Sequence, residues 1–439
     1  MRTPTRRLDP AEAWAPYGPT PDAPWDLARV AHLHRRAGFT ASWRTLQRDL
    51  ADGPSASVDR LLKGGPDAEF DAQMDAMAAP SGTVERARAA WLYRLIQTPH
   101  PLRERMTLFW HDHFATSDAK VNNPGGMVRQ NALLREHALG DFRKLLTAMA
   151  RDPAMLVWLD ATTNRKEHPN ENYAREVMEL FALGRGHYTE KDVQEAARAF
   201  TGTYVQADHY IERPAQHDDG VKTVLGRSGN LRGDDIAGIL LEQPACADFL
   251  AGKLYRHFID EIEEPTPDLL SPLADVLRRS DYDLGATMAV LVRSRIFFDA
   301  AHRRRRVKSP VEFAVGTIRA LEILDPTVSA DALAASTSAM GQALYAPPSV
   351  AGWGSGSAWI NTSSSLSRAN FALSLLGTDG PLGGRFDPEK LAKRHGAGPT
   401  FYVDLLVQDA LDESVKRRLG GSAREAASLL LTSPEYQLA

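Results

Sequence analysis

The chain has 439 residues, 43% hydrophobic and 25% charged, a composition typical of a folded globular protein and not of a disordered or fibrous one. Its 52 basic and 56 acidic residues nearly balance, so no overall field favours nucleic acid as a partner. The single cysteine, Cys246, excludes an internal disulfide and a multi-cysteine metal cluster, and we expect it to be a core residue.

The length exceeds what one compact core usually holds, so we expect one large domain or two closely packed ones. We place a main helical domain at 1–380 and a C-terminal helical segment, packed on it, at 381–439. Near the N-terminus, Arg6 and Arg7 are followed by Leu8-Asp9-Pro10, where a signal peptide needs an apolar run, so we expect no export signal. No window reaches the roughly 18 apolar residues of a membrane helix, so we expect no membrane span.

Apolar residues recur at helical spacing along the chain, which predicts a mainly α, multi-helix globular bundle. Two starts are marked by capping boxes, Thr189 with Asp192 and Ser309 with Glu312. In chain order, helices are predicted at 84–97, 102–114, 128–137, 142–149, 171–183, 189–200, 245–258, 284–298, 309–324, 330–344 and 365–376.

Three stretches break the helical pattern. Glycines and short β-branched runs near 202–229 predict a small β-hairpin or an irregular insertion. Prolines and glycines exclude a helix near 345–362, while Trp353 and Trp359 argue against disorder, so we expect a long ordered loop there. The stretch 377–399 is rich in Gly and Pro and is typical of a linker.

The first cluster of candidate site residues lies in the sequence FWHDHF, at the end of the helix predicted at 102–114. Residues two apart on a helix point about 200° apart, so His111 and His113 can share one metal only where the helix loosens. The His-x-His pattern occurs in metal sites. The alternative is one buried, hydrogen-bonded histidine and one exposed histidine, and the sequence leaves both open.

The second cluster lies on one predicted helix. Spacing of four and then three places Asn172, Glu176 and Glu179 on a single flank beside the apolar stripe, where a carboxylate can line a cleft. The alternative is that Glu171, Arg175 and Glu179 form surface pairs four residues apart. That alternative leaves out Glu176, which has no basic residue four positions away.

The third cluster is the sequence HDDGVK in the irregular insertion. His217 and Asp218 can supply a metal ligand or a base, and Lys222 can position an anionic substrate group. Turns also use Asp and Gly purely for backbone geometry, an interpretation with at least equal weight.

The fourth cluster is the sequence PPSVAGW, which continues to Asn361. Trp353 and Asn361 on a rigid loop suit stacking against a sugar ring or another planar group with one hydrogen-bond anchor. They equally suit a loop that plugs the helical core. A separate basic run, from Arg303 to Arg306, is typical of a solvated face or an acidic-partner contact and is assigned no function.

Seven short motifs follow one another along most of the chain: HLHRRAGF from His32, FWHDHF from Phe109, ENYARE from Glu171, HDDGVK from His217, KSPVEF from Lys308, PPSVAGW from Pro347 and SPEYQ from Ser433. In this order they resemble one bacterial family, the domain of unknown function family eighteen-hundred. The resemblance implies a largely helical fold. It also implies that the His, Glu and Asp clusters are family features, which favours a shared site. Many relatives look exported, whereas the absence of an export signal predicts a cytoplasmic location for this chain.

The clusters together favour a metal-dependent enzyme, because histidine with carboxylate suits a divalent metal: iron, zinc or manganese. One metal would activate water for hydrolysis, and redox-active iron would support oxidation. The expected metal ligands are His111, His113, Glu176 and His217. The expected catalytic groups are Glu176, Glu179 and Asp218, and the expected substrate contacts are Asn172, Arg175, Lys222, Trp353 and Asn361.

Two alternatives stay open. In the first, the chain is a binding or scaffold protein whose Trp-containing loop engages a glycan or a partner protein. In the second, it is a metal-free acid-base enzyme that uses Glu176 with His113 or His217. The sequence contains no nucleophile elbow, no P-loop, no glycine-rich dinucleotide turn and no His-Glu-x-x-His pair, which argues against the common nucleotide-binding and zinc-protease interpretations.

Overall fold

A computed structural model describes residues 9–63, 67–78, 82–398, 400–408, 411, 419 and 421–439. Over these residues the fold is mainly α-helical, as predicted, and its strands form two small antiparallel sheets. Arg6 and Arg7, residue 399 of the predicted linker and parts of the predicted C-terminal segment lie outside the described residues. Within the described part, no helix combines the length and apolar character needed to cross a bilayer.

The first half of the chain is built of helices, whose bounds are these: α1 (Pro10–Trp14), α2 (Leu27–Arg36), α3 (Trp43–Leu62), α4 (Ala68–Ala78), α5 (Val84–Gln97), α6 (Pro101–His113), α7 (Asp118–Val121), α8 (Pro124–Glu136), α9 (Phe142–Met149), α10 (Pro153–Trp158), α11 (Asn172–Glu176), the π-helical turn η2 (Val177–Ala182) and α12 (Glu190–Ala199). Short 3-10 turns such as η1 (Ala161–Thr163) join some of them.

The second half begins with four strands, β1 (Thr203–Gln206), β2 (His209–Glu212), β3 (Lys222–Val224) and β4 (Arg227–Gly229), with the 3-10 turn η3 (Pro214–Gln216) between β2 and β3. The later elements are α13 (Gly233–Glu242), α14 (Pro244–Phe258), α15 (Pro267–Arg279), α16 (Leu284–Arg293), α17 (Arg295–Phe298), η4 (Ala300–His302), α18 (Pro310–Ala320), α19 (Ala330–Ala339), η5 (Gly356–Trp359), α20 (Thr362–Leu376), α21 (Pro388–Arg394), η6 (Val403–Val407), α23 (Ala423–Leu431) and η7 (Glu435–Gln437).

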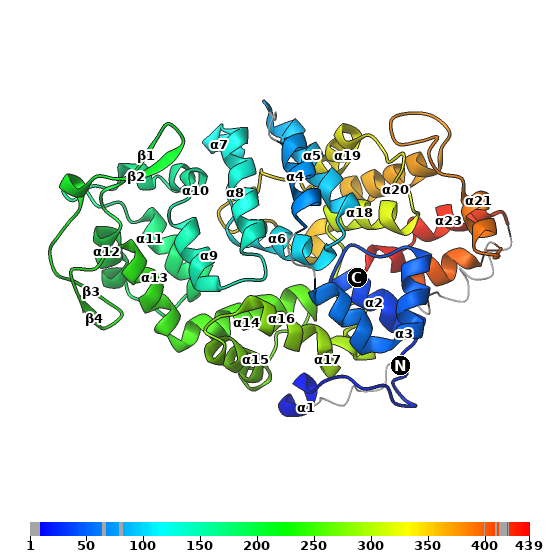
Figure 1. Cartoon of the computed structure of the whole chain (residues 1–439), viewed down its shortest axis with the longest axis horizontal. Coiled ribbons are helices and arrows are strands. Elements are labelled where there is room, and N and C mark those ends of the chain that lie inside the picture. The colour runs from blue at the N-terminus through cyan, green and yellow to red at the C-terminus, as the bar shows by residue number, and fades with distance from the viewer. Residues whose placement is uncertain are drawn as a thin grey trace.

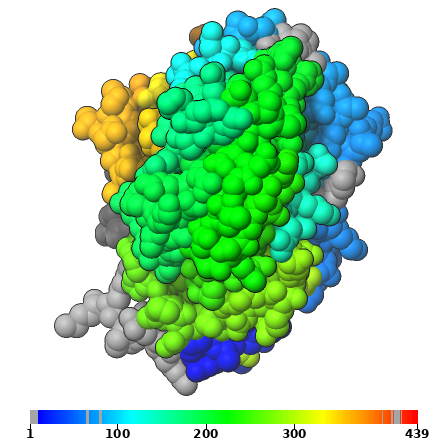
Figure 2. Space-filling model, turned by 90° about the vertical axis from the view of Figure 1, so that its left-hand side faces the viewer, coloured from blue at the N-terminus to red at the C-terminus, as the bar shows by residue number. Residues whose placement is uncertain are grey.

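The hairpins and the helices near them form one end of the molecule. Figure 1 shows α12, α13 and β1–β4 at one end of the long axis and α20, α21 and α23 at the other, with α6, α8 and α16 between them. Figure 2 looks onto the hairpin end, where the green part of the chain forms a continuous front. Strand β1 packs on α10 and β3 packs on α12, so each hairpin is anchored to a helix.

The insertion predicted near 202–229 is two hairpins, not one. β1 pairs with β2 from Thr203 opposite Glu212, and β3 pairs with β4 from Lys222 opposite Gly229. Each connecting turn has two residues with positive φ, as tight hairpin turns require: Ala207 and Asp208, then Leu225 and Gly226.

Local side-chain chemistry sets several helix ends. Both predicted capping boxes are confirmed: Thr189 Oγ1 accepts the Asp192 N–H at 3.2 Å, and Ser309 Oγ accepts the Glu312 N–H at 3.3 Å. The helix predicted at 284–298 is instead split into α16 and α17. Ser294 separates them, since its hydroxyl caps α17 by accepting the Phe297 N–H at 3.3 Å.

Two further boundaries differ from the prediction. The helix predicted at 330–344 ends at Ala339, because Gly341 has a φ of +107° that no helix accommodates. The stretch 377–399 contains α21, so the linker prediction was wrong there. Asp387 caps α21 by accepting the Lys390 N–H at 3.2 Å, and Leu391 buries its side chain in the core.

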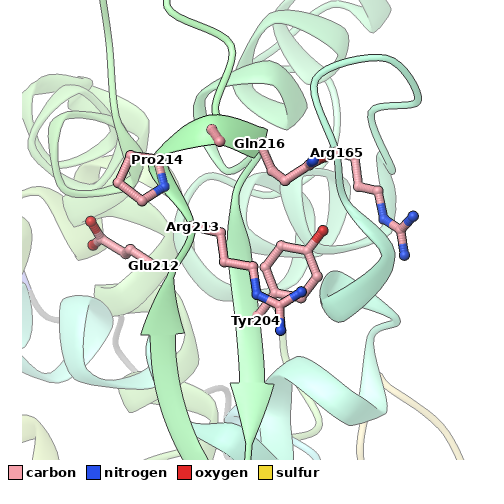
Figure 3. Close-up of a pocket in the computed structure, with 7 residues that line it drawn as sticks. Arg165, Tyr204, Glu212, Arg213, Pro214 and Gln216 are labelled. Atoms are coloured by element: carbon pink, nitrogen blue, oxygen red, sulfur yellow. The ribbon is translucent and has the colours of Figure 1, made fainter.

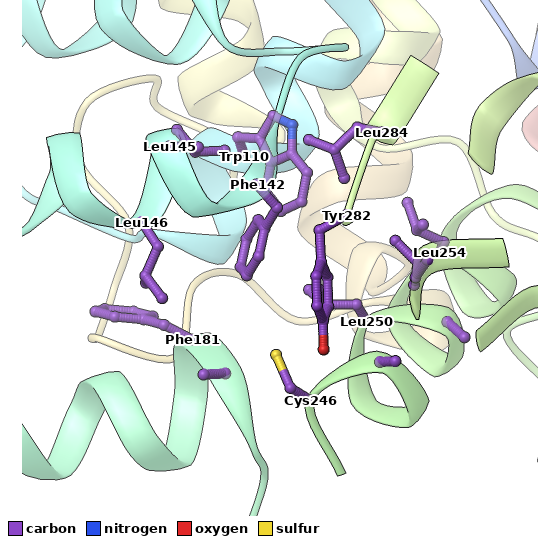
Figure 4. Packing of buried hydrophobic residues seen from close by; sticks show 14 of the residues in the cluster. Trp110, Phe142, Leu145, Leu146, Phe181, Cys246, Leu250, Leu254, Tyr282 and Leu284 are labelled. Carbon is purple, nitrogen blue, oxygen red and sulfur yellow. The ribbon is translucent and has the colours of Figure 1, made fainter. Parts of the chain in front are cut away.

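The core consists of two hydrophobic clusters. In the first, Trp110 from α6 packs on Phe142 from α9 with ring centroids 5.5 Å apart, beside Leu250 from α14. Figure 4 shows these side chains converging with Tyr282 and Leu284. Cys246 is buried in the same cluster, which confirms that it is a core residue.

The second cluster joins α18 to both earlier and later parts of the chain. Phe313 packs on Phe371 of α20 at 5.9 Å and on Tyr436 at 5.8 Å, and buried residues from α2, α5, α21 and α23 belong to the same cluster. Residues of the predicted C-terminal segment therefore pack in a core shared with α18. The division at residue 380 itself stays a prediction.

Candidate functional site

The two histidines at the end of α6 point into different surroundings. His111 Nε2 accepts the backbone N–H of Tyr345 at 3.1 Å, whereas His113 Nε2 donates to the backbone oxygen of Phe181 at 3.1 Å. Burial lowers the pKa of His111 to about 3 and lowers the pKa of His113 well below its ordinary value, so both rings are neutral at pH 7. The ring nitrogens that face these partners are not available to a shared metal.

Asp112 lies between the two histidines in the sequence, and its carboxyl group has an unusual environment. Its Oδ1 accepts the backbone N–H of Trp353 at 2.8 Å, and its other oxygen makes no hydrogen bond within the described part of the chain. Burial raises the pKa of Asp112 to about 6, although the charges of Lys253 and Arg306 oppose the shift. The side chain is half-buried, so it keeps contact with solvent.

Lys253, from α14, completes this group. Its ammonium donates to His113 Nδ1 at 3.2 Å and to the backbone oxygen of Leu180 at 3.3 Å, which leaves one of its three hydrogens unused. Burial lowers the pKa of Lys253 to about 8, and the negative charge of Asp112 limits the shift. Both carbonyl oxygens that hold the Lys253 and His113 pair, those of Leu180 and Phe181, lie in the π-helical turn η2.

The predicted long loop packs directly on Asp112. Gly352 has a φ of +84°, and a Cβ on it would lie 2.7 Å from the Asp112 backbone oxygen and would overlap Oδ1 as well. The Trp353 ring lies 5.5 Å from the His111 ring, and Trp359 is buried. Asn361, predicted as a substrate contact, caps α20 by accepting the Ser364 N–H at 2.9 Å. Gly352 and Trp359 are buried whereas Asn361 is exposed, so this loop is partly packed and partly open to solvent.

A buried network of opposite charges adjoins the Asp112 site. Glu312, at the start of α18, lies 2.6 Å from both Arg105 of α6 and Arg306. Arg36 of α2 lies nearby and donates to the backbone oxygen of Phe258 at 3.0 Å. Arg306 couples this network to Asp112, because its positive charge favours the charged form of the carboxyl group. The run from Arg303 to Arg306 is therefore no simple solvated face, since only 6% of Arg306 is exposed.

The second predicted cluster is held mainly by surface pairs. Arg175 pairs with Glu171 at 3.0 Å and with Glu190 at 2.7 Å. Glu179 accepts from Arg185 at 2.6 Å and from the Tyr188 hydroxyl at 2.7 Å. Asn172 is exposed, and its amide reaches Asp160 at 3.5 Å.

Within that cluster, Glu176 has the carboxyl group whose pKa is raised. It is half-buried, and burial together with the charge of Glu179 raises its pKa. This agrees with the prediction that surface pairing does not account for Glu176.

The third predicted cluster stabilises the hairpin region. Asp218 accepts from Arg198 at 2.7 and 3.2 Å, and the buried Lys222 donates to Asn230 and to the Gly220 backbone oxygen at 3.1 Å. His217 is buried and donates from Nδ1 to the Thr201 backbone oxygen at 2.9 Å. These contacts fit the turn-forming interpretation of the HDDGVK sequence.

The predicted metal ligands do not form one group. Across the described residues, no set of three or more His, Cys, Asp or Glu side chains is placed to hold a metal ion. His111 and His113 diverge because they are two positions apart on a regular helix. The divalent metal, as iron, zinc or manganese, stays a prediction.

Several residues of this site were not singled out from the sequence. Asp112 stands between the two histidines predicted as metal ligands, and Lys253 lies within a predicted helix without any role assigned to it. One signal was present: Lys253 and His257 are four apart, so they share one face of helix α14. Arg105 has no comparable signal, because its partner Glu312 is distant in sequence.

Fold and site together define a mainly α-helical globular protein with a half-buried aspartate and lysine beside a buried network of arginine and glutamate. The family model described as protein of unknown function (DUF1800) matches residues 32–438, so the chain belongs to this family. The match confirms the family that the seven motifs indicated. No curated protein and no solved structure matches the chain.

Proposed function

We propose that the chain is an enzyme that performs acid-base catalysis with Asp112 and Lys253. One observation carries the proposal: an aspartate and a lysine, both half-buried, interact electrostatically beside His113, and each retains an unused hydrogen-bonding position. The proposal keeps the metal-free acid-base alternative from the sequence. It moves the reacting groups from Glu176 to Asp112 and Lys253.

The two side chains are tuned towards neutral pH from opposite directions. The pKa of Asp112 rises to about 6 and that of Lys253 falls to about 8, both because of burial. Acid-base catalysis is most effective when the pKa of the group lies near the working pH. At pH 7 most Asp112 is ionised and most Lys253 is protonated, so one can accept a proton and the other can donate one.

This assignment fits hydrolysis of a small-molecule, glycan or peptide substrate. Asp112 takes a proton from the attacking water, whose oxygen bonds to the substrate, and Lys253 donates a proton to the departing group. Solvent then returns the proton from Asp112 to Lys253, which balances the cycle. His113 acts as a positioning residue, because its Nδ1 accepts from Lys253 while its Nε2 is fixed by the Phe181 carbonyl.

The proposal can be tested before a substrate is known. A trace amine-selective reagent, read by mass spectrometry over a pH series, should label Lys253 with a midpoint near pH 8, below that of exposed lysines such as Lys191. Asp112→Asn should move the midpoint lower still, because the ammonium loses a favourable negative charge. A midpoint near the ordinary 10.5 would overturn the proposal.

Substrate screening supplies the second test. Any turnover found should be lost in Asp112→Asn and kept in Asp152→Asn. Asp152 is a matched control, since burial also raises its pKa to about 6 while it serves as a helix cap, accepting the Met155 N–H at 2.8 Å. Full turnover in Asp112→Asn would contradict the assignment.

A further inference from the structure

A surface cavity of about 500 Å³ lies beside the β1–β2 hairpin, away from Asp112. Its walls come from β1, from the end of β2 with the turn η3, and from the loop before α11, and Figure 3 shows the side chains that line it. They are Arg165, Tyr204, Glu212, Arg213, Pro214, Ala215 and Gln216. The volume lies within the range of small-molecule sites, roughly 300 to 1,000 Å³.

Backbone contacts hold the walls of this cavity in place. The Lys166 N–H donates to the Gln216 oxygen at 3.1 Å, which ties the loop that carries Arg165 to η3. The Arg213 N–H donates to the Gly202 oxygen at 2.8 Å. Gly202 has a φ of +83°, and a Cβ there would lie 2.9 Å from the Arg213 oxygen, so only glycine permits this approach.

Two arginines flank the cavity without acidic partners. The Arg213 guanidinium stacks over the Tyr204 ring at 4.2 Å, and Figure 3 shows Arg165 on the far side of that ring from Glu212. Of the residues that the structure describes, none places a carboxylate within 4.0 Å of either guanidinium.

The carboxylate of Glu212 is engaged elsewhere. It accepts from the Tyr210 hydroxyl at 2.8 Å and lies 4.0 Å from Arg232. Two arginines against this one carboxylate leave the lining of the cavity with a net positive charge.

We infer that this cavity binds a small molecule through a phosphate or carboxylate group held between Arg165 and Arg213. The guanidinium is planar and presents paired N–H donors that match such an oxyanion. Stacking on Tyr204 holds Arg213 in place before the ligand arrives, which reduces the entropy lost on binding. This site is independent of the acid-base proposal, because neither Asp112 nor Lys253 lines the cavity.

The test is calorimetric titration of the full chain at low ionic strength with two separate probes, pyrophosphate and citrate. We expect saturable binding of at least one probe, and the tighter probe shows whether the site prefers phosphate or carboxylate. Arg165→Gln and Arg213→Gln should each weaken that binding about tenfold or more. Arg213→Lys keeps the charge but not the paired donors, so we expect part of the loss.

The matched control is Arg227→Gln on β4, which removes one exposed positive charge outside the cavity, where Arg227 pairs with Glu242 at 2.7 Å. Binding should survive this change, and it should survive Asp112→Asn. Absence of saturable binding in the wild type would overturn the inference. So would an equal loss in the Arg227→Gln control, since that result would mean general charge attraction.

Discussion

Gly352 lies so close to Asp112 that a Cβ on the glycine would approach the Asp112 backbone oxygen to 2.7 Å and overlap Oδ1. The long loop and the end of α6 thus meet with almost no space between them. The next residue, Trp353, uses this closeness to donate its N–H to the same carboxyl group at 2.8 Å. Any side chain at position 352 has to push the loop away from the proposed catalytic aspartate.

Gly352→Ala should therefore destabilise the protein through both backbone strain and direct overlap. Gly53→Ala is the matched control, because Gly53 has the same φ of +84° and no heavy atom within 4 Å of its added Cβ. We expect the free energy of unfolding to fall by about 1 kcal/mol in the control and by at least about 1 kcal/mol more in Gly352→Ala. Urea unfolding measures both, and equal losses would show that the contact with Asp112 adds nothing.

Asp112→Asn should stabilise the fold at pH 8 although it abolishes the proposed activity. The folded pKa of Asp112 lies near 6, above the ordinary 3.8, so the fold disfavours the charged form. The native state binds the proton that the unfolded state has lost, so wild-type stability falls as pH rises from about 4 to about 6. Asparagine removes this penalty and still accepts the Trp353 N–H.

Asp112→Asn should raise the free energy of unfolding by about 2 kcal/mol at pH 8. One pKa unit corresponds to roughly 1.4 kcal/mol, and the value is reduced because the group is only half-buried. The gain should vanish below pH 4, where the wild-type carboxyl is protonated in both states. Thermal unfolding of both proteins from pH 4 to pH 8 measures it. A variant that is less stable than the wild type at pH 8 would contradict the prediction.

Glu312→Gln should strongly destabilise the protein, because it leaves Arg105 and Arg306 buried without their shared partner. Breaking a buried ion pair from one side costs about 3 to 5 kcal/mol. Glutamine can still accept the Ser309 N–H that closes the capping box, so the loss is electrostatic. Glu242→Gln, which removes an exposed partner of Arg227, should change little.

The Glu312 effect has a defined pH dependence. The nearby guanidinium groups hold the pKa of Glu312 at about 2, below its ordinary 4.5, despite the opposing effect of burial. Its contribution is present above pH 4.5 and is lost as pH falls towards 2. The difference between wild type and Glu312→Gln should therefore shrink across that interval, and a constant difference would count against the charge network.

Removal of metal should leave the protein unchanged if the acid-base proposal is right. Treatment with a chelator is expected to alter neither the midpoint of thermal unfolding nor any turnover found. Elemental analysis of protein purified without added metal provides the check, alongside His111→Ala with Glu176→Ala. Near-stoichiometric metal that disappears in a still-folded double variant would restore the metal-dependent hypothesis and its ligand set.

Much of the helical framework follows from local sequence. The bounds of α5 and α9 match their predicted ranges, and the capping boxes at Thr189 and Ser309 fix the starts of α12 and α18. These features depend on residues within a few positions of one another, so spacing alone reveals them. The family is likewise apparent from the order of the motifs.

The site was harder to predict, since it depends on contacts between distant segments. Lys253 reaches His113 across 140 positions, and the Trp353 N–H reaches Asp112 across 241. His111 and His113 were predicted as metal ligands from their residue type, yet their ring nitrogens contact backbone groups and Lys253. The pKa of Asp112 is raised only in the folded chain, where the loop packs against it and burial outweighs the charges of Lys253 and Arg306.

The π-helical turn η2 makes the number of residues in this part of the chain as important as their identity. In such a turn the N–H of Leu183 reaches back five residues to the Met178 oxygen, at 2.8 Å. The oxygens of Leu180 and Phe181 instead accept Lys253 and His113. Deleting one residue here would restore ordinary helix and rotate both carbonyls by about 100°. Substitutions along the turn should therefore be tolerated far more readily than a change in the number of its residues.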